Sequence, residues 1–173
     1  WATPRNALDL MKKLPWALKM AGTKRRDFGN IVGHAKGVEN VKSLSQWTHS
    51  QFDPALDWDA VKRIKDRWGG KLILKGILDE EDAATALKSG ADAIIVSNHG
   101  GRQLDGAPSS ISMLPRIVRE VGDKIEVHMD GGIRSGQDVL KARALGARGT
   151  YIGRAMLYGL GAMGEAGVTE ALR

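Results

Sequence analysis

The sequence predicts an α/β fold built around a parallel β-sheet. Four short apolar runs begin near residues 72, 93, 125 and 149, and each is followed by a segment with helical patterning. These starts are 21, 32 and 24 residues apart. Strands and helices that alternate at such spacings form right-handed βα units, and the strands of these units are parallel.

Cap and turn residues mark the ends of the elements. Acidic side chains before a helix accept hydrogen bonds from its first free N–H groups, and glycines close helices because they adopt left-handed backbone angles. The expected elements alternate along the chain: a helix over 57–68, a strand over 71–76, a helix over 79–90, a strand over 93–97, a helix that ends near 121, a strand over 125–130, a helix over 136–145, a strand over 149–153 and an apolar run over 155–160.

The first predicted helix begins at Asp57 and ends at Gly69. Its apolar side chains, Ile64 and Trp68 among them, share one face, and Lys65 is expected to lie mostly on the outer side of the helix. The acidic run over 79–82 opens the next helix and is explained by the favourable field at a helix N-terminus.

Residues 29–54 have a mixed composition. Glycines, an Asp-Pro pair and serines, including Ser43 and Ser45, indicate turns, and no chemistry is predicted there. His34 and His49 are expected to be structural or exposed. The histidines of the chain lack metal-ligand spacing, so no metal site is predicted.

The N-terminal segment is basic and amphipathic. Residues 6–21 carry apolar and basic side chains at helical spacing, and Pro15 is expected to end one short helix and open another. The net charge of +6 equals the excess in residues 1–26, whose charged residues are Arg5, Lys12, Lys13, Lys19, Lys24, Arg25 and Arg26 against Asp9. This segment, residues 6–26, could bind an anionic membrane surface, or it could pack as a helix with a solvated basic face.

Length and composition further limit the class of protein to which this chain can belong. The chain has 173 residues and no cysteine, which excludes disulfides and thiolate metal sites. A complete eight-unit β/α barrel typically needs about 250 residues, so we expect an internal piece of a longer protein. The sequence contains neither an apolar run of the ~18 residues that span a membrane nor a visible signal peptide, which favours a reducing, cytoplasmic setting.

The stretch from Ser97 to Gly106 directly follows the predicted strand at 93–96. A strand that ends at His99, with two glycines and Arg102 next, places an imidazole and a guanidinium at a carboxyl edge where α/β proteins hold their chemistry. Histidine titrates near neutrality, and the planar fork of arginine matches a carboxylate. The alternative is a glycine-rich turn whose histidine and arginine are merely solvated.

Residues 97–103, Ser-Asn-His-Gly-Gly-Arg-Gln, resemble the signature of the FMN-dependent α-hydroxy-acid oxidoreductases. This family contains glycolate oxidases, respiratory L-lactate dehydrogenases and mandelate dehydrogenases, and the resemblance extends from about Phe28 to the end of the chain. It implies a (β/α)8 TIM barrel, of which this chain carries roughly the C-terminal half, strands 5 to 8. Residues 1–27 then form the loop after barrel strand 4, which binds the membrane in membrane-associated members, and residues 28–173 form the half-barrel.

The resemblance also implies residue roles. His99 takes a proton from the substrate, and Arg102 binds its carboxylate. Lys75 lies against the flavin N1 and O2 edge, where a fixed positive charge stabilises the reduced anionic ring, and Ser97 contacts the flavin. Without the resemblance, Lys75 would be interpreted as a snorkelling side chain or an ion-pair partner.

Two glycine- and arginine-containing turns follow the last two strands. In such barrels, turns of this kind form a phosphate pocket from backbone N–H groups and helix N-termini. We assign the FMN phosphate to the backbone of Gly132 and Gly153 with Arg134 and Arg154, and the ribityl hydroxyls to Asp130, whose alternative role is a cap or loop bracket. The predicted cofactor residues are Lys75, Ser97, Asp130, Gly131, Gly132, Ile133, Arg134, Gly153 and Arg154.

The predicted function is FMN-dependent oxidation of an L-2-hydroxy acid, L-lactate or mandelate-like, to the 2-oxo acid. A glycolate-oxidase-type enzyme that uses oxygen is the alternative, and the choice between hydride and carbanion routes stays open. The inosine monophosphate dehydrogenase group shares the phosphate pattern but needs a cysteine that this chain lacks. A non-catalytic membrane- or polyanion-binding module would leave residues 97–103 unexplained.

The expected partners are the substrate and an electron acceptor, which is a quinone, a cytochrome or oxygen. We expect no nucleic acid, a homo-oligomer such as the tetramer typical of the family, and a cytoplasmic location, peripheral on the inner face of the membrane if residues 6–26 bind it. Family tyrosines and an aspartate that orients the histidine lie on earlier strands, so these 173 residues alone are expected to be inactive. The sheet should run in chain order, with the predicted side chains along one rim.

Overall fold

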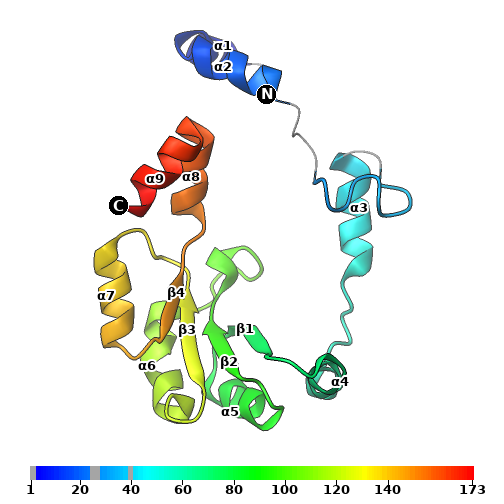
Figure 1. Ribbon diagram of the computed structural model, residues 1–173, viewed down its shortest axis with the longest axis vertical. Coiled ribbons are helices and arrows are strands. Elements are labelled where there is room, and N and C mark those ends of the chain that lie inside the picture. Colours follow the sequence, from blue (N-terminus) through cyan, green and yellow to red (C-terminus); the bar gives the residue numbers. More distant parts are fainter. Residues whose placement is uncertain (1–2, 24–27, 39–40) are drawn as a thin grey trace. The chain divides into compact units, whose positions relative to one another are not determined.

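The computed structural model describes residues 3–23, 28–38 and 41–173. The chain forms two compact units, residues 1–55 and residues 56–173, and each is described by itself (Figure 1). The boundary predicted between residues 27 and 28 adjoins residues 24–27, which lie outside the described residues together with three of the predicted basic side chains.

The first unit contains three helices in its described part, α1 (Pro4–Lys12), α2 (Leu14–Gly22) and α3 (Val41–Gln51). Pro15 is the second residue of α2, so the predicted break between two short helices is confirmed. The turns predicted at Ser43 and Ser45 are wrong, because both serines lie inside α3. Residues 41–51 contain neither Gly nor Pro, and serine alone disfavours a helix only weakly.

The second unit alternates helices and strands, as the sequence predicts. Its elements are α4 (Trp58–Trp68), β1 (Ile73–Ile77), α5 (Glu80–Lys88), β2 (Ala93–Val96), the short 3₁₀ turn η1 (His99–Gly101), α6 (Ser110–Val121), β3 (Glu126–Asp130), α7 (Gly136–Ala144), β4 (Gly149–Tyr151), α8 (Arg154–Met163) and α9 (Glu165–Leu172). The strands form one sheet in the order β1-β2-β3-β4, and all neighbours are parallel. The predicted topology is confirmed.

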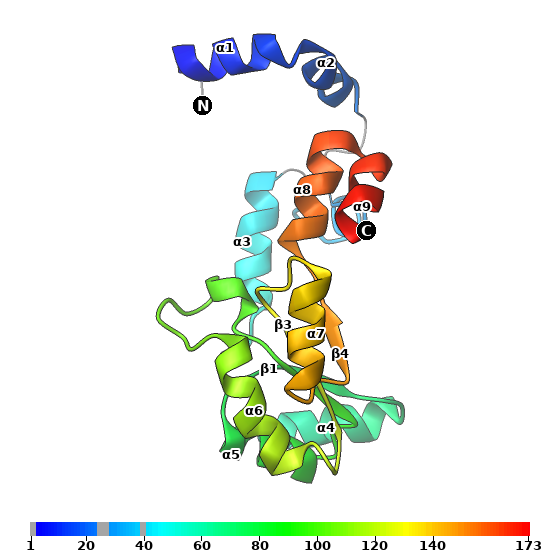
Figure 2. The same cartoon turned by 90° about the vertical axis from the view of Figure 1, so that its left-hand side faces the viewer.

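One face of the sheet is covered by α5, α6 and α7 (Figures 1 and 2). The strand register aligns Leu74, Ile94 and Val127 on this face. Ile94 is fully buried and Val127 is 1% exposed, so the core of the unit lies between sheet and helices. The helices contribute small and branched apolar side chains to it: Ala83, Ala86, Leu114, Ile117, Val121 and Ala142.

The opposite face of the sheet carries a more polar set of side chains. Lys75, Ile95 and His128 align in one row, and Asp130 and Tyr151 align in the next. Tyr151 is 41% exposed. This contrast between a closed helix side and an open polar side is what the inner wall of a partial barrel would show.

Asp92 links α4 to the sheet. Its carboxylate accepts hydrogen bonds from Lys65 Nζ at 2.5 Å, from Lys71 Nζ at 2.9 Å and from the backbone N–H of Leu72 at 2.8 Å. Lys65 also donates to the carbonyl of Gly70 at 2.9 Å.

The prediction that Lys65 lies on the outer, solvent-facing side of α4 is therefore wrong. Its side chain is half-buried, whereas Ile64 and Trp68 are 48% and 67% exposed. The ion pair with Asp92, twenty-seven positions further along the chain, turns this face of the helix toward the sheet. Helical spacing alone does not reveal such a partner.

Asp92 also makes stability depend on pH. The hydrogen bond from Lys65, then those from Leu72 and Lys71, hold the pKa of Asp92 far below its ordinary value. Because the pKa is lower in the folded state, this stabilisation is present above the unfolded pKa of about 3.9 and is lost as the pH falls below it. We expect Asp92→Asn to lower the free energy of unfolding at pH 7, and this loss to shrink between pH 5 and pH 2.

The measurement is urea unfolding of the intact protein and of the variant across this pH range. Asp59→Asn is the matched control, because Asp59 is 74% exposed and, within the described part of the chain, pairs only with Lys62, at 3.4 Å. Equal losses from Asp92→Asn at pH 7 and pH 3 would contradict the ionic role of Asp92.

Candidate active site

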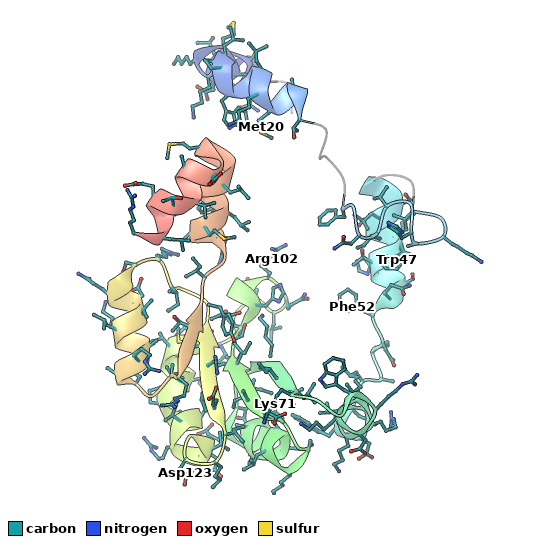
Figure 3. The ribbon with its side chains drawn as sticks, in the orientation of Figure 1. Met20, Trp47, Phe52, Lys71, Arg102 and Asp123 are labelled. Carbon is teal, nitrogen blue, oxygen red and sulfur yellow. The ribbon has the colours of Figure 1, made fainter. Side chains whose placement is uncertain are left out.

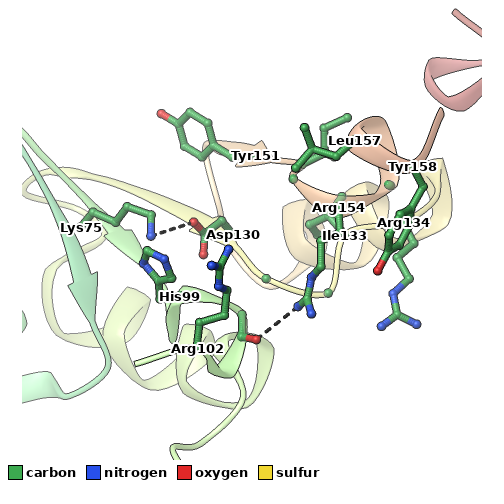
Figure 4. Close-up of a pocket in the computed structure, with 16 residues that line it drawn as sticks. Lys75, His99, Arg102, Asp130, Ile133, Arg134, Tyr151, Arg154, Leu157 and Tyr158 are labelled. Atoms are coloured by element: carbon green, nitrogen blue, oxygen red, sulfur yellow. Dashed lines mark hydrogen bonds and ion pairs between the residues drawn. The ribbon is translucent and has the colours of Figure 1, made fainter. Parts of the chain in front are cut away.

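The carboxyl ends of the four strands meet at one edge of the sheet and line a cavity of about 510 Å³ (Figure 4). Arg102 lies at this edge, and Asp123 lies at the opposite end of the sheet (Figure 3). Ten of the predicted site residues line the cavity: Lys75, His99, Arg102, Asp130, Gly131, Gly132, Ile133, Arg134, Gly153 and Arg154. Ser97, the eleventh, is 2% exposed and does not line it.

His99 and Arg102 stand on a tightly wound turn after β2. His99 has φ of 56°, and the next two glycines have φ of 69° and 71°. A non-glycine residue in this left-handed region costs roughly 1–3 kcal/mol and is held there by its surroundings. The Asn98 side chain accepts from the N–H of Gly100 at 3.0 Å, and the Ser97 hydroxyl accepts from the N–H of His99 at 3.1 Å.

Lys75 connects three strands at this edge. Its ammonium lies 3.2 Å from Asp130 Oδ2 and donates to the Ser97 hydroxyl at 3.0 Å (Figure 4). The side chain is 42% exposed. Lys75 is therefore an ion-pair partner, and its charge stands at the cavity edge beside His99.

Asp130 has one oxygen without a protein partner. Its Oδ1 is buried and makes no hydrogen bond among the described residues, while Oδ2 takes the ion pair with Lys75. A buried carboxylate oxygen is costly to leave unpaired, so it fits a hydroxyl or N–H donor of a ligand. Among its described contacts, Asp130 makes no hydrogen bonds to backbone N–H groups, which it would make if it capped a helix or held a loop together.

Two helices begin at the other end of the cavity, and their N-termini differ. At α7 the Asp138 carboxylate accepts the N–H groups of Arg134 and Ser135, both at 3.1 Å. These bonds lower the pKa of Asp138 and occupy this N-terminus with a negative charge. At α8 the N-cap is Gly153, without a side-chain cap and without an acidic residue in the first turn.

This difference bears on where an anion can bind. The free N–H groups and the helix dipole make the start of α8 the better anion site of the two. A Cβ placed on Gly132 or on Gly153 would meet no atom within 4 Å, so open space borders the backbone at both positions. Arg134 and Arg154 also line this end of the cavity.

The charge of the cavity is positive. Its lining contains Lys75, Arg102, Arg134 and Arg154 against the single acid Asp130. Such a lining attracts and retains anionic ligands.

Sequence reasoning missed Tyr151 as a lining residue. Its hydroxyl lies 3.3 Å from His128 Nδ1, and His128 Nε2 lies 3.0 Å from the Glu126 carboxylate. The rings of Tyr151 and His128 stack with centroids 5.7 Å apart. The hydrogen bond to His128 lowers the pKa of Glu126. The polar residues at 126, 128 and 130 alternate along β3, and this alternation could have predicted that one face of the sheet is polar.

Other lining residues also went unpredicted. They flank the predicted positions along the chain and are Gly100, Ile152, Ala155, Leu157 and Tyr158.

Within the described residues, no group of three or more His, Cys, Asp or Glu side chains could hold a metal ion. None of the described helices is long and apolar enough to cross a membrane.

Comparison with known proteins places the chain among flavin enzymes. The sequence profile of the family described as FMN-dependent dehydrogenase matches residues 1–173. An L-lactate dehydrogenase of Pseudomonas syringae pv. syringae (strain B728a) is 46% identical over 173 residues, which are 99% of this chain and 46% of that protein. An L-lactate dehydrogenase of Caulobacter vibrioides (strain NA1000 / CB15N) is 49% identical over 157 residues, which are 91% of this chain and 41% of that protein.

Solved structures give the same result for the fold. The monotopic membrane protein (S)-mandelate dehydrogenase has a TM-score of 0.85 at 37% identity, over 99% of this chain and 45% of that chain. A mandelate oxidase has a TM-score of 0.70 at 47% identity, over 78% of this chain and 39% of that chain. This chain thus spans about half the length of the relatives that it matches.

Ser97 and Ser89, two of the buried serines of the second unit, allow a test of the local hydrogen bonding. Ser97 is 2% exposed and accepts from His99 and Lys75, whereas Ser89 is 4% exposed and its hydroxyl has no partner among the residues that the structure describes. We expect Ser97→Ala to lower the free energy of unfolding by about 1 kcal/mol, because it leaves a backbone N–H unpaired. Ser89→Ala should be neutral or stabilising. Urea unfolding of both variants of the intact protein measures this, and equal effects would refute it.

Proposed function

The chain belongs to the FMN-dependent dehydrogenase family, and from this premise we propose that its protein oxidises an L-2-hydroxy acid, L-lactate or mandelate-like, to the 2-oxo acid. The observation that carries the proposal is the convergence of His99, Arg102 and Lys75 on one positive cavity at the carboxyl edge of the sheet.

The residues of the cavity fit FMN. The unpaired Oδ1 of Asp130 supplies an acceptor for a ribityl hydroxyl. The open backbone at Gly132 and Gly153 and the free start of α8 suit the phosphate, with Arg134 and Arg154 as charge partners. Gly131 and Ile133 complete this turn, and Ser97 orients Lys75 toward the flavin ring.

FMN supplies an acceptor for the two electrons of the oxidation when it is bound. Lys75 holds a positive charge at the edge of the cavity, next to the place where negative charge grows during the reaction. The bond to Ser97 and the ion pair with Asp130 fix its position, so little reorganisation is needed.

Arg102 and His99 divide the work on the substrate. The Arg102 guanidinium binds the carboxylate through two parallel hydrogen bonds, which orients the hydroxyl-bearing carbon. His99 takes a proton from the substrate through its imidazole. Both side chains are exposed to the cavity, so neither needs a large movement to meet a substrate.

Several features belong to the whole protein. We assign the electron acceptor to a quinone, a cytochrome or oxygen, the last of which corresponds to a glycolate-oxidase-type enzyme. The residues of this chain alone are proposed to be inactive, because they form only part of the barrel wall. A homo-oligomer is proposed for the intact protein.

We further propose that residues 6–26 attach the protein to the cytoplasmic face of a membrane. Nearly all described side chains of α1 and α2 are exposed, including the large apolar ones Leu8, Leu10, Met11, Leu14, Trp16, Leu18 and Met20. Exposed apolar side chains beside clustered lysines suit the interface of an anionic bilayer. The likeness to a monotopic membrane protein supports the same proposal.

The role of His99 predicts a separation of chemistry from cofactor binding. In the intact protein, His99→Gln should slow reduction of the flavin by the 2-hydroxy acid at least about a hundredfold, because the general base is lost. Bound FMN should remain, since the imidazole serves the substrate. Stopped-flow absorbance measures the first and released flavin the second. Reduction at the wild-type rate would remove His99 from the reaction.

The membrane proposal predicts a charge effect. Reversal of Lys12, Lys13 and Lys19 to Glu should weaken binding to anionic vesicles at least about a hundredfold, since each lysine near the surface contributes about 1 kcal/mol. Activity with a soluble acceptor should persist. Vesicle sedimentation at low and high salt measures the binding.

The control reverses three exposed lysines of the second unit, Lys88, Lys124 and Lys141, which changes the net charge equally. If both triple variants sediment alike, α1 and α2 do not carry the attachment, and they pack as helices with a solvated basic face.

A further inference from the structure

The turn that bears His99 is anchored mainly by its own neighbours. Besides the two side-chain bonds to Ser97 and Asn98, the N–H of Gly101 donates to the carbonyl of Asn98 at 3.0 Å. Asn98 in turn is bonded to Ser110 and Pro108, at 3.3 Å each. All of these partners lie within residues 97–110, so they fix the turn to its own loop.

One bond joins the turn itself, residues 99–101, to a segment outside this loop. Arg154 Nη2 donates to the carbonyl of Gly100 at 3.2 Å, across 54 positions of the sequence (Figure 4). In the described part of the chain, it is the one hydrogen bond that joins residues 99–101 to an element beyond residue 110. Arg154 is the first residue of α8 and also lines the end of the cavity proposed for phosphate.

Residue 100 admits this contact because it is glycine. A Cβ at position 100 would lie 2.8 Å from Arg154 Nη2, closer than real Cβ atoms come. Gly101 has nearly the same φ, 71° against 69°, but a Cβ there would meet no atom within 4 Å. Both glycines therefore have a left-handed φ, and they differ in that Arg154 lies close to Gly100 and not to Gly101.

A guanidinium has five N–H donors in a fixed plane. Arg154 can thus hold the Gly100 carbonyl with one nitrogen and present its remaining donors to an anion. Arg134 lines the same end of the cavity, but among the described residues its hydrogen bond is made by its backbone N–H, which donates to Asp138. The two arginines are alike in charge and differ in the link to the turn.

We propose that Arg154 is a positioning residue, which ties the His99–Gly101 turn to the start of α8 and so couples the filling of the phosphate end to the placement of His99 and Arg102. The identity of the anion rests on the proposed function, but the link between Arg154 and the turn does not. By linkage, an anion that orders Arg154 also orders the turn, and an ordered turn favours the anion.

The test measures amide hydrogen exchange of residues 97–104 in the intact protein, with and without FMN. Arg154→Lys keeps the charge but loses the planar fork, so exchange in this loop should rise about tenfold in the protein without FMN, the effect of one lost hydrogen bond. The matched control is Arg134→Lys, which should leave amide exchange of the loop at the rate of the unchanged protein. FMN should slow the exchange in the unchanged protein and much less in Arg154→Lys.

Substitutions of Gly100 and Gly101 test the same contact without changing any charged side chain. Gly100→Ala should raise exchange of the loop more than Gly101→Ala does, because the two glycines have nearly the same left-handed φ and only at position 100 would the added Cβ meet Arg154. At equal flavin occupancy, reduction of the flavin by L-lactate should be about tenfold slower in Arg154→Lys than in Arg134→Lys.

Equal exchange in the two lysine variants and in the two alanine variants would overturn the proposal and leave Arg154 as a simple anion ligand. A protein that binds no FMN would instead refute the proposed function, and the exchange measured without FMN would still decide the role of Arg154.

Discussion

Parallel pairing of β1 to β4 in chain order is the constraint on which the site depends. The register sets Lys75, Ile95 and His128 in one row and Asp130 and Tyr151 in the next, so that side chains from different βα units share one face. Because parallel strands end at the same edge, the loops after β2, β3 and β4 converge there. The Lys75–Asp130 ion pair at 3.2 Å spans this edge and joins the outer strand to the third.

The site contains features that reduce stability locally. His99 has a left-handed backbone, Asp130 has a buried oxygen that no described residue pairs with, and four cations line the cavity against one acid. The surroundings sustain these features through the packed helix face of the sheet and through the anchors at Ser97 and Asn98. Such departures from ordinary packing gather where a protein binds and reacts.

Much of this arrangement could be predicted from the sequence. Strand spacing gave the parallel order, and caps such as Asp57 and Asp79 placed helix starts correctly. Residues 97–103 and the later glycine- and arginine-containing turns located the cavity, since the carboxyl edge of a parallel sheet is set by topology. Contacts between distant segments could not be predicted: Lys65 faces Asp92, Arg154 reaches Gly100, and Tyr151 stacks on His128. Helix α3 was missed because its serines carry two opposing local preferences, for turns and for helix interiors.

We propose that this cavity serves FMN-dependent oxidation of an L-2-hydroxy acid. The most direct measurement is the flavin absorbance of the purified intact protein after anaerobic addition of L-lactate or L-mandelate, with the D-enantiomers as controls. We expect bound FMN whose absorbance bleaches with at least one L-acid and stays unchanged with its D-enantiomer. Absence of bound FMN, or flavin that stays oxidised with every 2-hydroxy acid, would contradict it.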